Sequence, residues 1–292
     1  ALFAVLMGVA EAGDEVLVSD PFYATYEGLI RATGADLSTV PLRPGNGFRM
    51  RAADVKERLT PKTRAILLTT PHNPTGAIMT AEELRSIGEL ALRHEFWIVS
   101  DEVYAALTFD GSDPPSPLAL PEVADRTIVA SSISKSHAAP GFRSGWCVGP
   151  AEFARSLLPL SETMLFGNPP FTADMTEQAI RQGSTVAAGM SQRYAARAAM
   201  LKQRLDAGSD LKVHPPEAGM FAMVDISATG LDGQAYALDL LERQGVAVMP
   251  GSSFGEGARN WVRVALTVDD NSFGTACDRI VTHARNPGKE TT

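Results

Sequence analysis

The chain has 292 residues and a net charge of −8, and 45% of its residues are apolar. This length predicts one large domain or two moderate ones, since domains contain about 100–200 residues. The acidic balance argues against a nucleic-acid partner, and no apolar run approaches the ~20 residues of a membrane span. Cys147 and Cys277 provide neither a disulfide framework nor a four-ligand zinc site, so we expect reduced thiols in a cytoplasmic protein.

The first residues, 1–10, are apolar and predict the body of a buried helix without an N-cap residue. They lack the charged region and cleavage site of a signal peptide. We therefore expect that further chain belongs upstream of Ala1.

Strands and helices then alternate. Apolar, β-rich runs predict strands at 15–19, 36–40, 64–70, 96–100 and 127–130. Helices are predicted over 23–32 and 80–94, the second with a capping box between Thr80 and Glu83. Repeated strand–helix units of this size predict an α/β fold, with a mostly parallel sheet covered by helices on both faces.

The second half of the chain changes style. Long helical patterns cover 151–165, 172–181 and 184–207, and they are followed by strands at 219–224, 246–248 and 261–265 with helices at 231–243 and 271–283. We interpret residues 1–183 as a large ligand-binding domain. Residues 184–292 are interpreted as a linker helix and a small C-terminal α+β domain.

Polar residues follow the buried strands, where ligands of such sheets bind. Asn73 stands before a proline, which predicts extended backbone in a tight turn, and a plain turn is the alternative interpretation. Asp101 ends an apolar strand and needs a partner, because buried unpaired charge is costly. A helix N-cap carboxylate is the alternative for Asp101.

The next strand leads into Ser132-Ile-Ser134-Lys135, and Gly141-Phe-Arg143-Ser-Gly145 follows. Lysine is rarely buried without a task, and desolvation makes its amine nucleophilic. Hydroxyl and guanidinium donors in this string suit one phosphate group. The alternative is that Lys135 is an exposed lysine in a polar loop. That interpretation accounts for the lysine but not for the serines, the arginine and the glycines around it.

Tyr23 follows the first strand and either stacks on a flat ring or packs in the core. Arg263 lies inside an apolar strand, where a guanidinium needs an anion and fits a carboxylate bidentately. An internal salt bridge is the alternative for Arg263. The five histidines lack metal-ligand spacing, so we predict no metal site.

Taken in order, these motifs resemble the fold-type I, pyridoxal-phosphate-dependent aminotransferases of the class I and II group. The resemblance covers the whole chain and is strongest from Ser132 to Gly145. It implies a large domain with a seven-stranded type of sheet, and a homodimer. It also implies transfer of an α-amino group between an L-amino acid and a 2-oxo acid.

The resemblance assigns a role to each candidate residue. Lys135 binds the cofactor aldehyde as a Schiff base and moves the substrate proton, and Arg263 holds the substrate carboxylate. The remaining contacts are to the cofactor: Asp101 at the pyridine nitrogen, Tyr104 and Asn73 at the phenolic oxygen, Tyr23 on the ring face, and Ser132, Ser134 and Arg143 around the phosphate.

Two narrower expectations follow from the same resemblance. The strings Lys135-Ser-His-Ala and 219–231 are similar to those of bacterial arginine–pyruvate transaminases. Family members also carry an upstream segment with a phosphate-binding loop and part of the substrate cover. For the chain as written we therefore expect weaker retention of pyridoxal phosphate and reduced activity.

Three alternatives stay open at this stage. Gly251-Ser-Ser253-Phe-Gly255 fits the nucleophile motif of serine hydrolases, although no helix is predicted directly after it. A non-catalytic sensor that binds pyridoxal phosphate would use the same residues. Another reaction with the same cofactor, such as β-elimination, would use them too.

Overall fold

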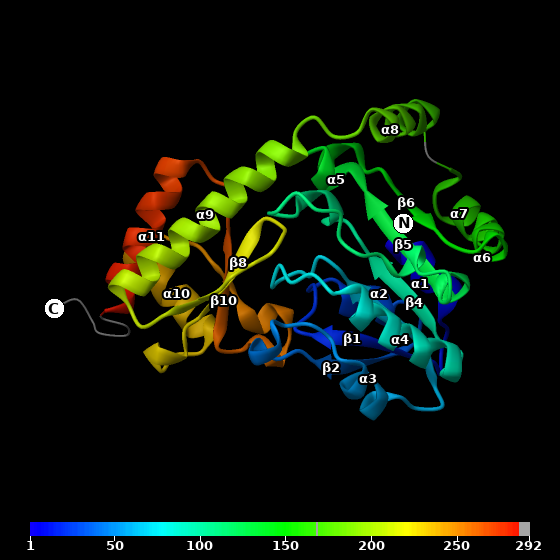
Figure 1. The fold of residues 1–292 in the computed structure, drawn as a ribbon, viewed down its shortest axis with the longest axis horizontal. Coiled ribbons are helices and arrows are strands. Elements are labelled where there is room, and N and C mark those ends of the chain that lie inside the picture. Colours follow the sequence, from blue (N-terminus) through cyan, green and yellow to red (C-terminus); the bar gives the residue numbers. More distant parts are fainter. Residues whose placement is uncertain (168, 286–292) are drawn as a thin grey trace.

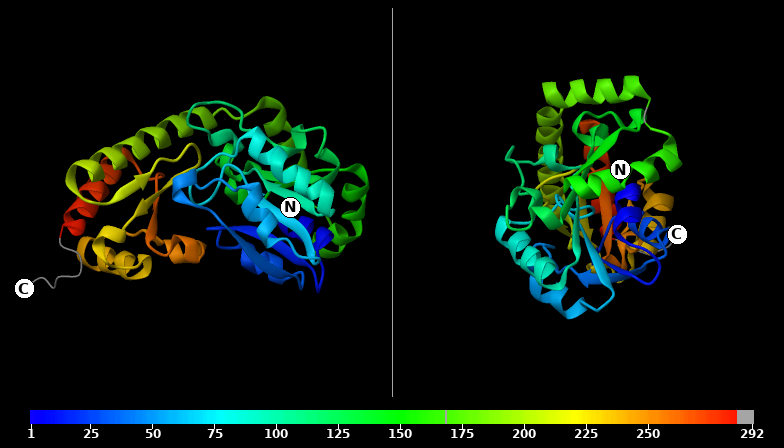
Figure 2. Two further views of the ribbon diagram at one scale, coloured as in Figure 1. Left: turned by 60° about the horizontal axis from the view of Figure 1, so that its bottom comes forward. Right: turned by 90° about the vertical axis from the view of Figure 1, so that its right-hand side faces the viewer.

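The computed structural model of the protein describes residues 1–167 and 169–285. Two sheets lie at opposite ends of the molecule, each with helices packed against it (Figures 1 and 2). Helix α9 (Ala187–Gly208) runs from the region of the larger sheet over the smaller one (Figure 1). Within the described ranges, no helix is both long enough and apolar enough to cross a membrane.

The larger sheet has the strand order β2-β1-β3-β4-β5-β6 in the described part of the chain. Its strands are β1 (Glu15–Asp20), β2 (Asp36–Pro41), β3 (Thr63–Thr69), β4 (Trp97–Asp101), β5 (Thr127–Ser132) and β6 (Gly145–Val148). Neighbours among the first five are parallel, and β6 is antiparallel to β5. The predicted mostly parallel sheet is confirmed. These residues form six strands where the resemblance implies seven, and β6 was not predicted.

Side chains alternate between two separate cores on the two faces of this sheet, as the pleat requires. Leu17 and Ile98 belong to the core that contains α4 (Ala81–His94). Val16 and Val99 belong to the opposite core, which contains α1 (Leu2–Val9) and α2 (Tyr26–Arg31). Because both faces are covered, the strands read as continuous apolar runs rather than as alternating ones.

The other helices of this part are α3 (Ala52–Arg58), α5 (Ile133–Ser136), α6 (Ala151–Ser156), α7 (Leu158–Leu165) and α8 (Pro170–Gln182). The capping box at the start of α4 is confirmed, with the Thr80 hydroxyl and the Glu83 carboxylate each accepting the other residue's backbone N–H. The single helix predicted over 151–165 is wrong. It divides at Leu157, because Pro159 offers no N–H and fits only the first turn of a new helix.

The smaller sheet is antiparallel, with the order β7-β8-β10-β9. It comprises β7 (Lys212–His214), β8 (Phe221–Asp225), β9 (Met249–Pro250) and β10 (Trp261–Ala265), and it packs against α9, α10 (Gly233–Gln244) and α11 (Asp270–Ala284). The strand predicted at 246–248 is wrong. The buried Val246 packs into the core after a left-handed turn at Gly245, so pairing with β10 begins only at Met249.

The segments around the two sheets meet through backbone and side-chain contacts. The Phe22 N–H donates to the Phe254 carbonyl at 2.7 Å, and Arg49 forms an ion pair with Glu217 at 2.6 Å. Tyr104 follows β4 of the larger sheet but packs in the core of the smaller one. These contacts bring β10 close to the carboxyl ends of the parallel strands.

Candidate active site

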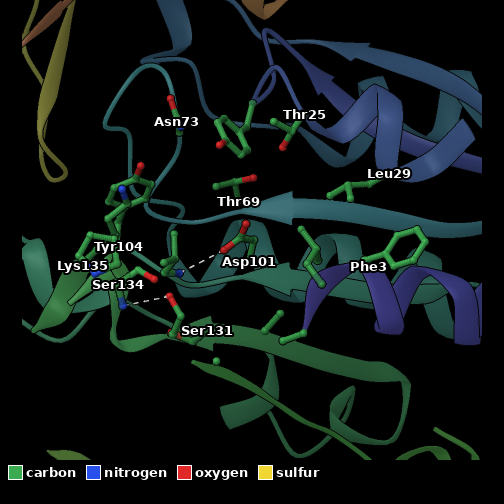
Figure 3. A pocket seen from close by; sticks show the side chains of 18 of the residues that line it. Phe3, Thr25, Leu29, Thr69, Asn73, Asp101, Tyr104, Ser131, Ser134 and Lys135 are labelled. Atoms are coloured by element: carbon green, nitrogen blue, oxygen red, sulfur yellow. Dashed lines mark hydrogen bonds between the residues drawn. The ribbon is translucent and has the colours of Figure 1, made fainter. Parts of the chain in front are cut away.

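The carboxyl ends of β3, β4 and β5 lie at one level of the larger sheet. Thr69 is paired with Asp101, and Asp101 with Ala130. Each of the three lies two residues after a strand residue that faces the core of α1 and α2. Because side chains alternate along a strand, all three side chains lie on that same face of the sheet. A cavity of about 420 Å³ lies there, and the side chains around it are seen in Figure 3.

Asp101 supplies the carboxylate of this cavity. Its Oδ2 accepts a hydrogen bond from the Tyr26 hydroxyl at 2.7 Å, and its Oδ1 accepts one from the Val103 N–H at 3.2 Å. Burial raises the pKa of Asp101, and the two hydrogen bonds act in the opposite direction. No lysine, arginine or histidine in the described ranges forms an ion pair with it. The site therefore contains a desolvated carboxylate without a cationic partner among the described residues.

Lys135 lines the same cavity from the short helix α5. Ser132 caps that helix, since its hydroxyl oxygen accepts the Ser134 N–H at 3.2 Å. The Lys135 side chain is half-buried, and its amine has no hydrogen-bond or ion-pair partner among the residues that the structure describes. An amine of this kind is open to a ligand in the cavity.

The segment after α5 brings further donors to the cavity wall. Arg143 has a left-handed backbone (φ 54°), and its Nη1 donates to the Pro140 carbonyl at 2.7 Å. That bond uses one of the five guanidinium N–H groups. Gly145 lies so close to β5 that a Cβ there would come within 2.7 Å of the Ser131 carbonyl oxygen. The glycine allows the chain to pass close beside Ser131 and Ser132.

Asn73 lines the cavity from the turn after β3 and meets Arg263 of β10. The Asn73 Oδ1 accepts a hydrogen bond from the Arg263 Nη1 at 3.0 Å, so the amide NH₂ keeps both of its hydrogens for other partners. The Arg263 guanidinium lies over the rings of Phe254 and Phe221, at 4.7 and 5.1 Å from their centroids. The alternative of an internal salt bridge finds no partner in the described part of the chain.

Two tyrosines complete the set named from the sequence. Tyr104 is 6% exposed and packs edge-on against Phe221, and burial raises the pKa of its hydroxyl. Tyr23 is 38% exposed and borders the cavity at right angles to Tyr26. The cavity thus brings together every predicted cofactor residue, and Arg263 adjoins it through Asn73.

Sequence reasoning missed two hydroxyls of this site, those of Tyr26 and Thr69. The Tyr26 hydroxyl lies 2.7 Å from the Thr69 Oγ1 and 2.7 Å from the Asp101 Oδ2. In the sequence, Tyr26 reads as one of several large side chains on the buried face of a helix. The position of Thr69 at the end of a strand, level with Asp101, was the available signal.

The hydrolase motif around Ser253 lies elsewhere. Residues Gly251–Phe254 form a short 3₁₀ helix that leads to Gly255, and no α-helix follows it directly. Ser253 is exposed and does not line the cavity. The geometry therefore lacks the strand-to-helix elbow that a hydrolase nucleophile needs.

Comparison with known proteins assigns the chain to one family. The profile of "Aminotransferase class I and II" matches residues 1–280. The chain is 42% identical to the arginine–pyruvate transaminase of Pseudomonas aeruginosa, over 96% of its own length and 71% of the relative's. It is 30% identical to an aspartate aminotransferase of Geobacillus stearothermophilus, over 96% and 72% of the two lengths.

Solved structures agree with the sequence relatives. The aspartate aminotransferase of Thermus thermophilus, solved with maleate, is similar to this chain with a TM-score of 0.88 and 28% identity. The match covers 96% of this chain and 72% of that one. The similarity therefore extends over both sheets and includes the elements around the cavity.

Proposed function

The chain belongs to the class I and II aminotransferase family, and on that premise we propose that the cavity beside Asp101 and Lys135 is its active site. The protein is a pyridoxal-phosphate-dependent aminotransferase, which transfers an amino group between an amino acid and a 2-oxo acid. The two alternatives that share this cofactor, a lyase and a sensor, receive no support from the relatives.

The residues of the cavity fit the cofactor. A protonated pyridine nitrogen would supply the cation that the desolvated Asp101 carboxylate lacks. The unpartnered amine of Lys135 suits an aldehyde, and the donors of Ser132, Ser134 and Arg143 suit a phosphate. The single observation that carries the assignment is this set of complementary groups around one cavity.

Bound pyridoxal phosphate supplies an aldehyde that takes up amines and a cationic ring that withdraws electrons from the carbon bearing the amino group. In our proposal the negative charge of Asp101 would favour the protonated form of the ring nitrogen. Tyr104 and the amide NH₂ of Asn73 would hold the phenolic oxygen as hydrogen-bond donors. Tyr23, at the cavity edge, would pack against the ring.

Arg263 orients the substrate. Its guanidinium is held by Asn73 and by two aromatic rings, and burial lowers the pKa of this group. A substrate carboxylate offers the bidentate anion that this guanidinium fits. A carboxylate held there would keep the amino-acid end of the substrate next to the cavity that Lys135 lines. The Lys135 amine, which lines the same cavity without a protein partner among the described residues, would be the group that accepts and returns the substrate proton.

For the substrates, we propose L-arginine as the first amino donor to test and pyruvate as the first acceptor. The support is the relative of 42% identity whose name states that pair. Side-by-side assays with aspartate and with an aromatic amino acid test the alternatives. Conversion of arginine no faster than of these two amino acids would contradict the proposal.

We also propose a boundary near residue 184, between a large domain over 1–183 and a linker helix with a small domain over 184–292. Two separate cores on the larger sheet and a third around the smaller one support it. We further propose a cytoplasmic homodimer. The free thiols of Cys147 and Cys277 support the compartment, and the exposed Phe166 and Phe171 support the dimer.

The test of the active site is chemical. Borohydride reduction of the protein with pyridoxal phosphate should fix the cofactor on the peptide that carries Lys135, as mass spectrometry would show. The Lys135→Ala variant should remain unlabelled at that peptide. A label on another lysine in the wild-type protein would refute the assignment.

A further inference from the structure

A chain of two hydroxyls runs behind the Asp101 carboxylate. Tyr26 comes from the first turn of α2 and Thr69 from the end of β3, and both face the core on the same side of the sheet as Asp101. The Tyr26 oxygen lies 2.7 Å from the Thr69 Oγ1 and 2.7 Å from the Asp101 Oδ2. The three groups therefore form a continuous hydrogen-bonded row.

The number of hydrogens on each group decides which hydroxyl donates and which oxygen accepts in this row. A phenol carries one hydrogen, and an ionised carboxylate only accepts, so the Tyr26 hydrogen is directed at the Asp101 Oδ2. The Tyr26 oxygen then accepts, and Thr69 is the donor to it. Burial and the nearby charge of Asp101 raise the pKa of Tyr26 well above its usual value, which keeps its hydroxyl protonated.

Packing holds the row in place. Tyr26 is 1% exposed and Thr69 is 6% exposed, so bulk water does not compete for either hydroxyl. The second carboxylate oxygen, Oδ1, is held by the Val103 N–H. Each oxygen of Asp101 thus has one fixed donor on the protein side, and the plane of the carboxylate is set before any ligand arrives.

We propose that Tyr26, oriented by Thr69, is a positioning residue that aims the Asp101 carboxylate at the cofactor ring nitrogen and weakens its hold on a proton. This inference rests on the proposed role of Asp101. A donor at Oδ2 stabilises the ionised carboxylate, so the proton shared between Asp101 and the ring nitrogen stays on the nitrogen. Without that donor, the proton shifts toward Asp101 and the carboxylate turns more freely.

Equilibrium dialysis of the apoenzyme with pyridoxal phosphate tests the proposal through the dissociation constant. We expect Tyr26→Phe to raise that constant about tenfold, the scale of one hydrogen bond to a charged group. Thr69→Val should raise it less, and should add nothing in the Tyr26→Phe background, because Thr69 acts through the Tyr26 hydroxyl. If the two substitutions have additive effects on the dissociation constant, Thr69 does not act through Tyr26 and the proposal is refuted.

Tyr236→Phe is the matched control. Tyr236 is equally buried, and its hydroxyl has no hydrogen-bond partner among the described residues, so the cofactor constant should not change. An equal loss of affinity in Tyr26→Phe and Tyr236→Phe would show a general effect of removing a buried hydroxyl and would refute the proposal.

A spectroscopic measurement distinguishes an effect of Tyr26 on the ring nitrogen from a purely structural role of its side chain. With ¹⁵N in the cofactor ring, the nitrogen resonance of the Tyr26→Phe complex should move from the wild-type position toward that of neutral pyridine. An unchanged resonance would refute the effect on the shared proton. The Asp101→Asn variant tests the proposed role of Asp101 itself. If this variant leaves both the resonance and the dissociation constant unchanged, the role of Asp101 is refuted. If both change in Asp101→Asn but not in Tyr26→Phe, only the positioning role of Tyr26 is refuted.

Discussion

Replacing Arg263 by lysine keeps the positive charge of the site but removes the planar pair of donors. In the structure the guanidinium is anchored on Asn73 at 3.0 Å and over the ring of Phe254 at 4.7 Å. A lysine ammonium cannot hold Asn73 and grip both oxygens of a carboxylate in the same geometry. If Arg263 holds the substrate carboxylate as we propose, the substitution removes about one charged hydrogen bond to it.

One such bond contributes about 1.5–3 kcal/mol, which corresponds to a loss in kcat/KM of roughly 10- to 160-fold. The assay is steady-state transamination of an amino acid, compared with the corresponding amine that lacks the carboxylate. Arg263→Lys should lower kcat/KM for the amino acid and leave that for the amine nearly unchanged. Arg259→Lys is a control, since Arg259 is exposed and pairs with Glu256 and Asp232 on the surface.

The ratio of kcat/KM for the amino acid to kcat/KM for the amine shows whether Arg263 recognises the carboxylate. If Arg263→Lys lowers both activities by the same factor, the guanidinium does not recognise the carboxylate, and the reasoning from its geometry is wrong. A loss confined to the amino acid supports it.

The remaining predictions concern stability. Thr80→Ala removes one half of the capping box on α4 and should lower the free energy of unfolding by about 1 kcal/mol in urea titrations, whereas no loss would contradict the reciprocal bonds. Burial lowers the pKa of His72 from 6.5 to about 4. As pH falls, His72 is therefore protonated in the unfolded state at a higher pH than in the folded state. The free energy of unfolding should then fall as pH decreases from about 6.5 toward 4. His72→Gln should flatten that part of the pH profile, and an unchanged slope would show that other groups, such as the similarly shifted His214, account for it.

The sequence predicted which side chains at the strand ends line the cavity, but it did not predict the residues that these side chains contact. Asp101 was found because a carboxylate that ends an apolar strand needs a reason, and Lys135 because lysine is rarely buried without a task. Tyr26 was missed, because nothing local shows that its phenol reaches a residue 75 positions later in the chain. Such a contact depends on the packing of α2 on the sheet.

Boundaries between elements were harder to predict than the elements themselves. The strands of the parallel core were predicted to within a residue or two, since continuous apolar runs are a strong signal of strands buried on both faces. Strands β6 and β9 are short and half-exposed, so their sequences carry little pattern. For Arg263 the sequence left a salt bridge open, and only the fold shows aromatic rings and an amide around it.

The two cores of the larger sheet also constrain the chemistry. Ile98 and Val99 point to opposite cores, and Asp101 has the parity of Val99. A slip of β4 by a single residue would exchange the two apolar sets and, in the same movement, turn the carboxylate away from the cavity. The apolar residues of this strand thus decide on which face Asp101 lies, so the packing of the interior and the proposed contact of Asp101 with the cofactor depend on the same strand register.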